Sequence, residues 1–202
     1  FSSGTEKSSY YASLSALSDP GWTIGDKLSQ FSGNLNANYN LSSKFKLNVI
    51  SDLSYKKETT PKQDVYDYAI THSRSMNPKE YYVNDFAPYN IFNEIDNAYK
   101  NINIANLRLQ AELTYKISKK VEATMMGAIR YYTSEQNTEY KENSNYAQSY
   151  RAMPNSLVRR YNPKLYDDPN DPYDLPNIVL PEGGIRERKD VSITSNHFRA
   201  TL

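Results

Sequence analysis

The sequence predicts an all-β protein, a transmembrane antiparallel β-barrel of which this chain supplies about six strands. Three observations lead to this prediction. Apolar and polar residues alternate over segments longer than ordinary soluble strands. One of the two faces so defined carries no charge, and the connections between segments are alternately short and long.

The segment from Gln30 to Leu41 shows the alternation most clearly. Its odd-numbered positions are apolar or glycine, and each even-numbered position is Gln, Ser or Asn. Successive side chains of a strand point to opposite faces, so we expect a strand with one apolar and one polar face. The same pattern predicts strands near residues 8–17, 30–41, 45–56, 104–117, 121–132 and 192–202.

Charge follows the same division in the four clearest strands. Their apolar faces hold no charged residue, whereas a helix would spread these apolar residues around its axis. The charged residues on the opposite faces are Lys46, Asp52, Lys56, Arg108, Glu112, Lys116, Glu122 and Arg130. The period of two therefore predicts a sheet with one apolar and one polar face.

The connections and the strand lengths distinguish a membrane barrel from a soluble antiparallel sheet that packs on a core. Tight connections at 42–44 and 118–120 alternate with long loops at 57–103 and 133–190. Outer-membrane barrels have short turns at one rim and long extracellular loops at the other. Strands of about 11 residues suit a tilted crossing of the bilayer, whereas soluble strands usually have about 5–6.

Aromatic residues lie near both ends of the apolar faces. Barrels carry an aromatic girdle at each membrane interface, so this placement also favours the membrane. The residues at the long-loop ends are Phe31, Tyr55 and Tyr131, and those near the tight turns are Tyr39, Phe45 and Tyr115.

Composition excludes several classes of protein. The formal net charge is +1, with 24 basic and 23 acidic residues, so no nucleic-acid partner is expected. No apolar run approaches the ~20 residues of a membrane helix. A mean hydropathy of -0.78 is compatible with a barrel, whose strands are apolar only at every second position. The absence of cysteine excludes disulfides and thiolate metal sites.

The two ends of the chain suggest an internal fragment of a larger barrel. No signal-peptide pattern follows Phe1, and Leu202 falls inside a strand pattern. Backbone polar groups need partners in lipid, so six strands alone are not expected to be stable there.

Several segments resemble the SusC/RagA family of TonB-dependent outer-membrane transporters from Bacteroidetes-type bacteria. GTEKSSYYASL at Gly4–Leu14, followed by Leu17–Gly21, resembles the family stretch GGTEKSSYYASLGYLNDEG. Ser3 departs from it, because the family usually has a second glycine there. Phe31–Asn36, Tyr89–Glu94 and Leu109–Ile117 resemble later family segments in the same order.

The resemblance implies a barrel of about 22 strands whose lumen is closed by a plug. It also implies a SusD-like surface lipoprotein that caps the barrel, a TonB complex acting through parts of the protein absent from this chain, and contact with lipid of the cell outer membrane. The implied cargo is an oligosaccharide or a peptide, and the sequence does not choose between them. The alternative function is a non-transport barrel whose loops serve adhesion or assembly of a surface complex.

The polar face supplies the first set of candidate cargo-binding residues. They are Asn34, Asn36 and Asn38 of an asparagine ladder that ends at Asn40, together with Arg108 and Glu112. Amide side chains both donate and accept hydrogen bonds, which suits hydroxyl-rich cargo. The alternative is that this face contacts the plug.

Charged residues of the polar face are also placed so that they can meet across adjacent strands. Arg108, Glu112, Glu122 and Arg130 are the residues concerned. Opposite charges on neighbouring strands stabilise a sheet, so the positions of these four allow ion pairs across the strands, and contact with the plug is expected ahead of contact with cargo.

The loop 57–103 supplies a second set, Tyr66, Tyr68, Tyr81 and Tyr82, with a short helix expected at 64–75. Tyrosine-rich loops bind well because a ring offers a large contact area with few rotatable bonds. These rings are expected to stack on sugars or to contact the lipoprotein, and packing of the loops on one another is the alternative.

Asp167, Asp168 and Asp171 are the only candidate ligands for a hard cation such as calcium. They lack the spacing and the glycine of an EF-hand loop, and the neighbouring prolines suit a stiff turn. We therefore expect no resident metal and no cofactor. His72 and His197 belong to no recognisable catalytic motif, so no enzymatic activity is expected.

Overall fold

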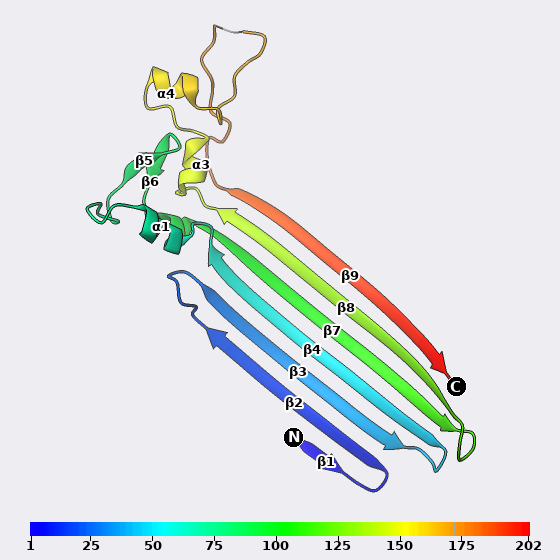
Figure 1. The fold of residues 1–202 in the computed structure, drawn as a ribbon. Coiled ribbons are helices and arrows are strands. Elements are labelled where there is room, and N and C mark those ends of the chain that lie inside the picture. Colours follow the sequence, from blue (N-terminus) through cyan, green and yellow to red (C-terminus); the bar gives the residue numbers. More distant parts are fainter. Residues whose placement is uncertain (172) are drawn as a thin grey trace.

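The computed structural model describes residues 1–171 and 173–202. The protein is mostly β-strand, and seven strands form one large antiparallel sheet whose spatial order follows the chain (Figure 1). These strands are β1 (Ser2–Gly4), β2 (Ser8–Asp19), β3 (Lys27–Asn40), β4 (Phe45–Pro61), β7 (Ala98–Lys116), β8 (Glu122–Tyr140) and β9 (Ile185–Thr201). Within the described ranges, no helix has the length and apolar character needed to cross a membrane.

A strand lies at each of the six predicted positions, and the sheet has a seventh, the short β1, that was not predicted. Four strands extend further toward the long loops than predicted. β4 continues to Pro61, β7 begins at Ala98, β8 continues to Tyr140 and β9 begins at Ile185. The predicted loop bounds of 57–103 and 133–190 are therefore too wide. The loops between these strands cover 62–97 and 141–184.

The strand extensions do not continue the apolar face that marks the rest of the sheet. Positions that continue the apolar face are taken by polar residues such as Lys57, Asn101 and Glu135. The extensions are held by continuous backbone pairing and by side-chain bonds such as that from the Thr59 hydroxyl to Asn101 Oδ1, at 2.7 Å. Hydrophobic periodicity cannot detect strands that are held in this way.

The register keeps the alternation of the long strands in phase. In an antiparallel pair, directly opposed residues point to the same face. One row runs through Leu35, Ser51, Leu109 and Ile129, and the adjacent row through Asn34, Asp52, Arg108 and Arg130. The sheet therefore has one apolar and one polar face, as the sequence predicts.

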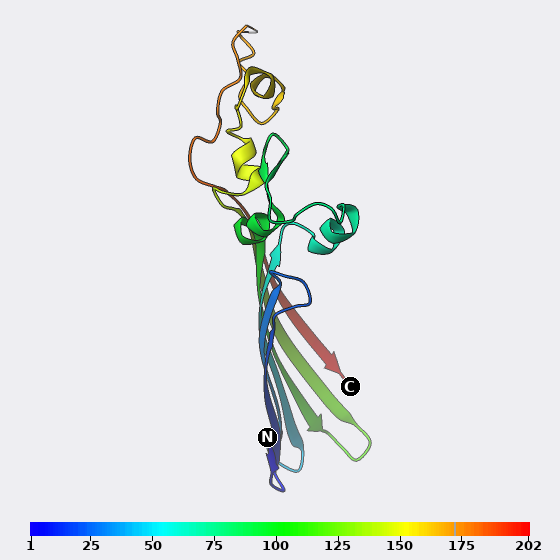
Figure 2. The ribbon, with the colours of Figure 1, turned by 90° about the vertical axis from the view of Figure 1, so that its left-hand side faces the viewer.

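No second layer covers the apolar face within the described part of the chain. Figure 2 shows the sheet as a single layer, with the helices gathered at one end. Leu109, Ile129 and Phe198 are 48%, 54% and 68% exposed, although they lie on paired strands. Contiguous exposed apolar surface of this kind marks a surface that contacts a partner or a membrane.

The two long loops fold into one structured unit, which we call the loop cap (residues 62–97 and 141–184). Its elements are α1 (Val65–Thr71), β5 (Tyr82–Asn84), β6 (Ala87–Tyr89), α2 (Ile91–Asn97), α3 (Asn145–Ser149) and α4 (Ser156–Tyr161). A helix lies within the expected range 64–75, but α1 ends at Thr71, four residues earlier than predicted. The Asp64 carboxylate caps it by accepting from the Asp67 amide. A small core of Tyr68, Tyr89, Ile91 and Ile95 lies inside the cap.

A buried polar contact joins the two halves of the loop cap. The Asn145 backbone amide donates to Glu94 Oε1 at 2.8 Å. The Asn145 side-chain amide donates to the carbonyl oxygens of Asn84, Ala87 and Pro88, at 2.7, 3.0 and 3.2 Å. Buried polar groups are costly unless they are hydrogen-bonded, so these bonds fix the loops to each other.

Burial raises the pKa of Glu94, and the hydrogen bonds from Asn145 and Asn93 oppose this only in part. The folded pKa lies above the unfolded value, so stability from this group is present at low pH and is lost as pH rises through the folded pKa. We expect Glu94→Gln, which keeps the acceptor and removes the charge, to stabilise the cap at neutral pH. Hydrogen exchange of α2 and α3 measured from pH 4 to 8 checks this, and an advantage of Gln that grew toward low pH would contradict it.

Candidate functional site

The asparagine ladder lies on the polar face of β3, and its side chains differ in whether their amide groups have hydrogen-bond partners. The Asn34 amide donates to the Asp52 carboxylate on β4, and Asn38 lies opposite Asn48. Asn36 Oδ1 and Asn48 Oδ1 are buried and have no hydrogen-bond partner among the described residues. Because both oxygens are shielded from solvent in this structure, they offer a cargo no accessible acceptor.

The charged residues of the polar face do not form the pairs that their sequence positions allow. Arg108 lies directly opposite Arg130, and Glu112 lies opposite Met126. Glu112 instead approaches Arg199 on β9 at 3.9 Å, and Glu122 pairs with Lys116 at 3.6 Å. These four residues therefore form no ion pairs with one another, because the register between β7 and β8 brings two like charges together.

The four candidate tyrosines divide into two groups. Tyr68 is buried, stacks on His72 with ring centroids 3.9 Å apart, and belongs to the cap core. Tyr82 packs against that core, and its hydroxyl is 3.1 Å from His72 Nε2. Tyr66 and Tyr81 are exposed. Only the exposed pair presents its rings to a ligand, while Tyr68 and Tyr82 hold the loop together.

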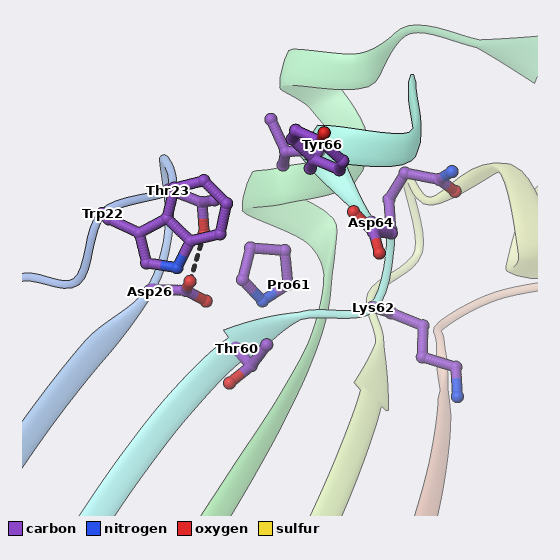
Figure 3. Close-up of a pocket in the computed structure, with 10 residues that line it drawn as sticks. Trp22, Thr23, Asp26, Thr60, Pro61, Lys62, Asp64 and Tyr66 are labelled. Atoms are coloured by element: carbon purple, nitrogen blue, oxygen red, sulfur yellow. Dashed lines mark hydrogen bonds between the residues drawn. The ribbon is translucent and has the colours of Figure 1, made fainter. Parts of the chain in front are cut away.

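A pocket of about 420 Å³, which we call the rim pocket, lies where the β2–β3 connection meets the end of β4 and the start of α1 (Figure 3). Trp22 and Tyr66 form an aromatic corner there, with ring centroids 6.0 Å apart and ring planes at 54°. Trp22 is 83% exposed and Tyr66 is 56% exposed. Aromatic faces beside polar groups can stack a flat ligand ring and bind its hydroxyl or amide groups.

The β2–β3 connection is shaped to reach the rim pocket. Gly25 has a φ of 94°, and a Cβ there would come within 2.5 Å of Pro61 Cγ and 2.8 Å of Ile95 Cγ2. The turn therefore requires glycine both for its backbone conformation and for its approach to β4. The Thr23 hydroxyl donates to the Asp26 carboxylate, which lies between Trp22 and Pro61 in Figure 3.

Trp22 is the residue that sequence reasoning missed. It is the one tryptophan of the chain and follows Asp19-Pro20-Gly21, a turn signal that ends a strand. An exposed tryptophan in a tight turn indicates a binding surface. It lies outside the alternation of apolar and polar residues from which the strands are predicted, so that pattern does not reveal it. Its proximity to Tyr66, 44 residues later in the sequence, follows only from the pairing of β3 with β4.

The acidic candidates are used within their own loop. Asp168 Oδ1 accepts from the Asn170 amide at 2.9 Å, and Asp171 Oδ1 accepts from the Tyr173 amide at 3.1 Å. Asp167 makes no side-chain hydrogen bond among the described residues. Throughout residues 1–171 and 173–202, no three His, Asp or Glu side chains are grouped closely enough to hold a metal ion.

The sequence of this chain matches no protein-family model and no curated protein.

Proposed function

We propose that this chain forms an arc of the wall, and two of the long loops, of a SusC-like TonB-dependent transporter in the outer membrane. The observation that carries this proposal is the uncovered apolar face. Between the tight turns and the polar extensions this face is uncharged over six paired strands, and no described residue outside the sheet covers it, which is compatible with a lipid environment.

The height of the apolar face suits a bilayer. Phe45 and Tyr55 mark its two ends on β4, ten residues apart. At about 3.3 Å per residue this is about 33 Å along the strand. With a barrel tilt of about 40°, the face is about 25 Å tall, which is the height of the apolar band of outer-membrane barrels.

The asymmetry of the sheet supports one orientation. At one end the strands meet in short turns, and at the other they continue past the apolar band as polar extensions that carry the loop cap (Figure 1). Short turns face the periplasm and long loops face outward in such barrels. The loop cap and the rim pocket therefore stand on the extracellular side.

The sheet edges support a larger closed barrel. Among the described residues, β9 pairs only with β8, and most of β2 pairs only with β3. Lipid offers no hydrogen-bond partner to such edges, so other polypeptide segments complete the barrel.

The transported cargo is an oligosaccharide or a peptide, and the rim pocket is its first contact. Trp22 and Tyr66 offer ring faces, and the neighbouring Asp64 and Lys62 offer charged groups. A SusD-like lipoprotein covers the loop cap, and the TonB complex supplies energy through parts outside this chain.

Growth experiments with the full-length protein test the proposal. A strain that lacks the gene is expected to lose growth on particular oligosaccharides or peptides as sole carbon source, and the wild-type gene restores it. Trp22→Ala/Tyr66→Ala is expected to raise the cargo concentration needed for half-maximal growth, while Tyr161→Ala, an exposed cap tyrosine outside the rim pocket, leaves it unchanged. Recovery of the protein in the soluble fraction, or growth unaffected on every such carbon source, would refute the proposal.

A further inference from the structure

Two arginines share one row of the polar face. Arg108 on β7 and Arg130 on β8 are directly opposed in the register, so their side chains leave the sheet on the same side and next to each other. Like charges placed directly opposite each other destabilise a sheet unless something neutralises them. The repulsion between these two positive charges therefore has to be offset by some other group.

The two side chains turn away from each other. Arg108 Nη2 donates to Gln110 Oε1 at 2.6 Å, toward the tight turns. Arg130 Nε donates to Asn106 Oδ1 at 2.9 Å, toward the loops, and its guanidinium lies 6.0 Å from the ring centroid of Tyr132. Both accepting groups are neutral amides, so neither contact compensates the positive charge.

The nearby carboxylates do not neutralise the pair. Asp52, opposite Arg108 on β4, accepts from the neutral Asn34 amide and forms no ion pair with Arg108 among the described residues, so it offsets at most one of the two positive charges. Glu112 lies nearest to Arg199. None of the ion pairs in the described part of the chain includes Arg108 or Arg130.

A pocket of about 670 Å³ lies over this row. Small residues, Ala128 and Ser195, line it beside the two arginines, and His197 on β9 adds a further nitrogen. The Asp52 carboxylate also lines it, on the side of Arg108. The guanidinium groups thus border a hollow, and each has five N–H donors of which one is used on an acceptor among the described residues, so donors remain for a bound group.

We infer that Arg108 and Arg130 exchange their bonds to Gln110 and Asn106, turn toward each other and together bind an oxyanion, the carboxylate or phosphate of a small acidic solute, in this pocket. Paired guanidinium groups bind such oxygens through short, charge-assisted hydrogen bonds, and the bound anion removes the repulsion between them. This inference rests on the proposed function only in that the polar face lines a water-filled space. In this role, Arg108 and Arg130 favour the passage of acidic cargo over neutral cargo.

Calorimetry on the full-length protein in detergent tests the inference, with inorganic phosphate and succinate titrated separately. Binding of either is expected, and Arg108→Gln/Arg130→Gln is expected to weaken it at least about tenfold, because each lost charge-assisted bond is worth about that factor. Tighter binding of phosphate indicates a phosphate ligand, and tighter binding of succinate indicates a carboxylate ligand. The double Lys variant, which keeps the charge but loses the planar fork, is expected to fall between wild type and the Gln variant.

Lys46→Gln is the matched control. Lys46 lies on the same face of β4, is exposed, and takes part in no ion pair among the described residues. Equal weakening by Lys46→Gln, or unchanged binding in the Arg variant, would overturn the inference. So would a wild type that binds neither anion while the Arg variant melts at a lower temperature, because a protein segment then occupies the pocket. If the strain grows normally on its cargo but the protein binds no oxyanion, this inference is wrong and the proposed function stands. If the protein is soluble but binds oxyanions in this pocket, the proposed function is wrong and the inference stands.

Discussion

Leu109→Arg is expected to prevent stable insertion of the barrel. Leu109 lies in the middle row of the apolar face, opposite Ser51 and Ile129, and in the proposed barrel this row falls at the bilayer midplane. A lipid-facing arginine at that depth costs about 2–4 kcal/mol, which is a large part of the stability of a folded protein. Folding of the full-length protein into lipid vesicles, followed during a urea titration, measures this loss.

The neighbouring position supplies the control. Gln110→Arg introduces the same side chain one residue later, on the polar face. It is expected to cost about 1 kcal/mol of unfolding free energy, which is less than the cost at Leu109. This cost comes from the lost hydrogen bond between Arg108 and Gln110 and from the added like charge, because the new side chain stays in water. Leu113→Arg, nearer to the tight-turn end of the band, should cost less than Leu109→Arg, because the penalty falls toward the interface. Equal costs at 109 and 110 would contradict the assignment of the two faces.

Asn145→Ala is expected to separate the two halves of the loop cap without unfolding the sheet. The change removes the donor to three carbonyl oxygens of the other loop and leaves them without that partner. The expected loss of local stability is on the order of 2–3 kcal/mol. Hydrogen exchange is expected to become faster in α2, β6 and α3 and to stay unchanged in the centres of β7 and β8.

Gln148→Ala is the matched control for that experiment. Gln148 lies on the same helix, and its side chain makes one exposed bond, to the Glu142 carbonyl at 2.9 Å. Its loss should leave exchange in α2 and β6 as in the wild type. If both variants behaved alike, Asn145 would not be the contact that joins the loops.

Much of the sheet could be predicted from the sequence because its central strands are governed by one physical rule. A face that avoids water alternates with a face that contacts it, and this is visible in Phe31 to Tyr39 or in Ala105 to Tyr115. The turns at 42–44 and 118–120 follow from the breaks in that pattern.

The rest depended on contacts that the alternation does not encode. The polar extensions, such as Lys57 to Pro61, are strands only because each finds a paired neighbour. The Arg108–Arg130 row required the register between β7 and β8, which a strand's own sequence does not determine. Trp22 meets Tyr66, and Glu94 meets Asn145, only after the sheet has brought their loops together.

Accessibility measurements along β7 test the lipid-facing assignment most directly. The chain has no cysteine, so single cysteines from position 105 to 115 can each carry a nitroxide label without background from this chain. In lipid vesicles, odd positions are expected to relax with oxygen, which concentrates in the bilayer, and even positions with a water-soluble nickel complex. The contrast should be greatest at 109 and 110. Labels at odd positions that are shielded from both reagents, or that respond to nickel as the even ones do, would show that this face does not contact lipid.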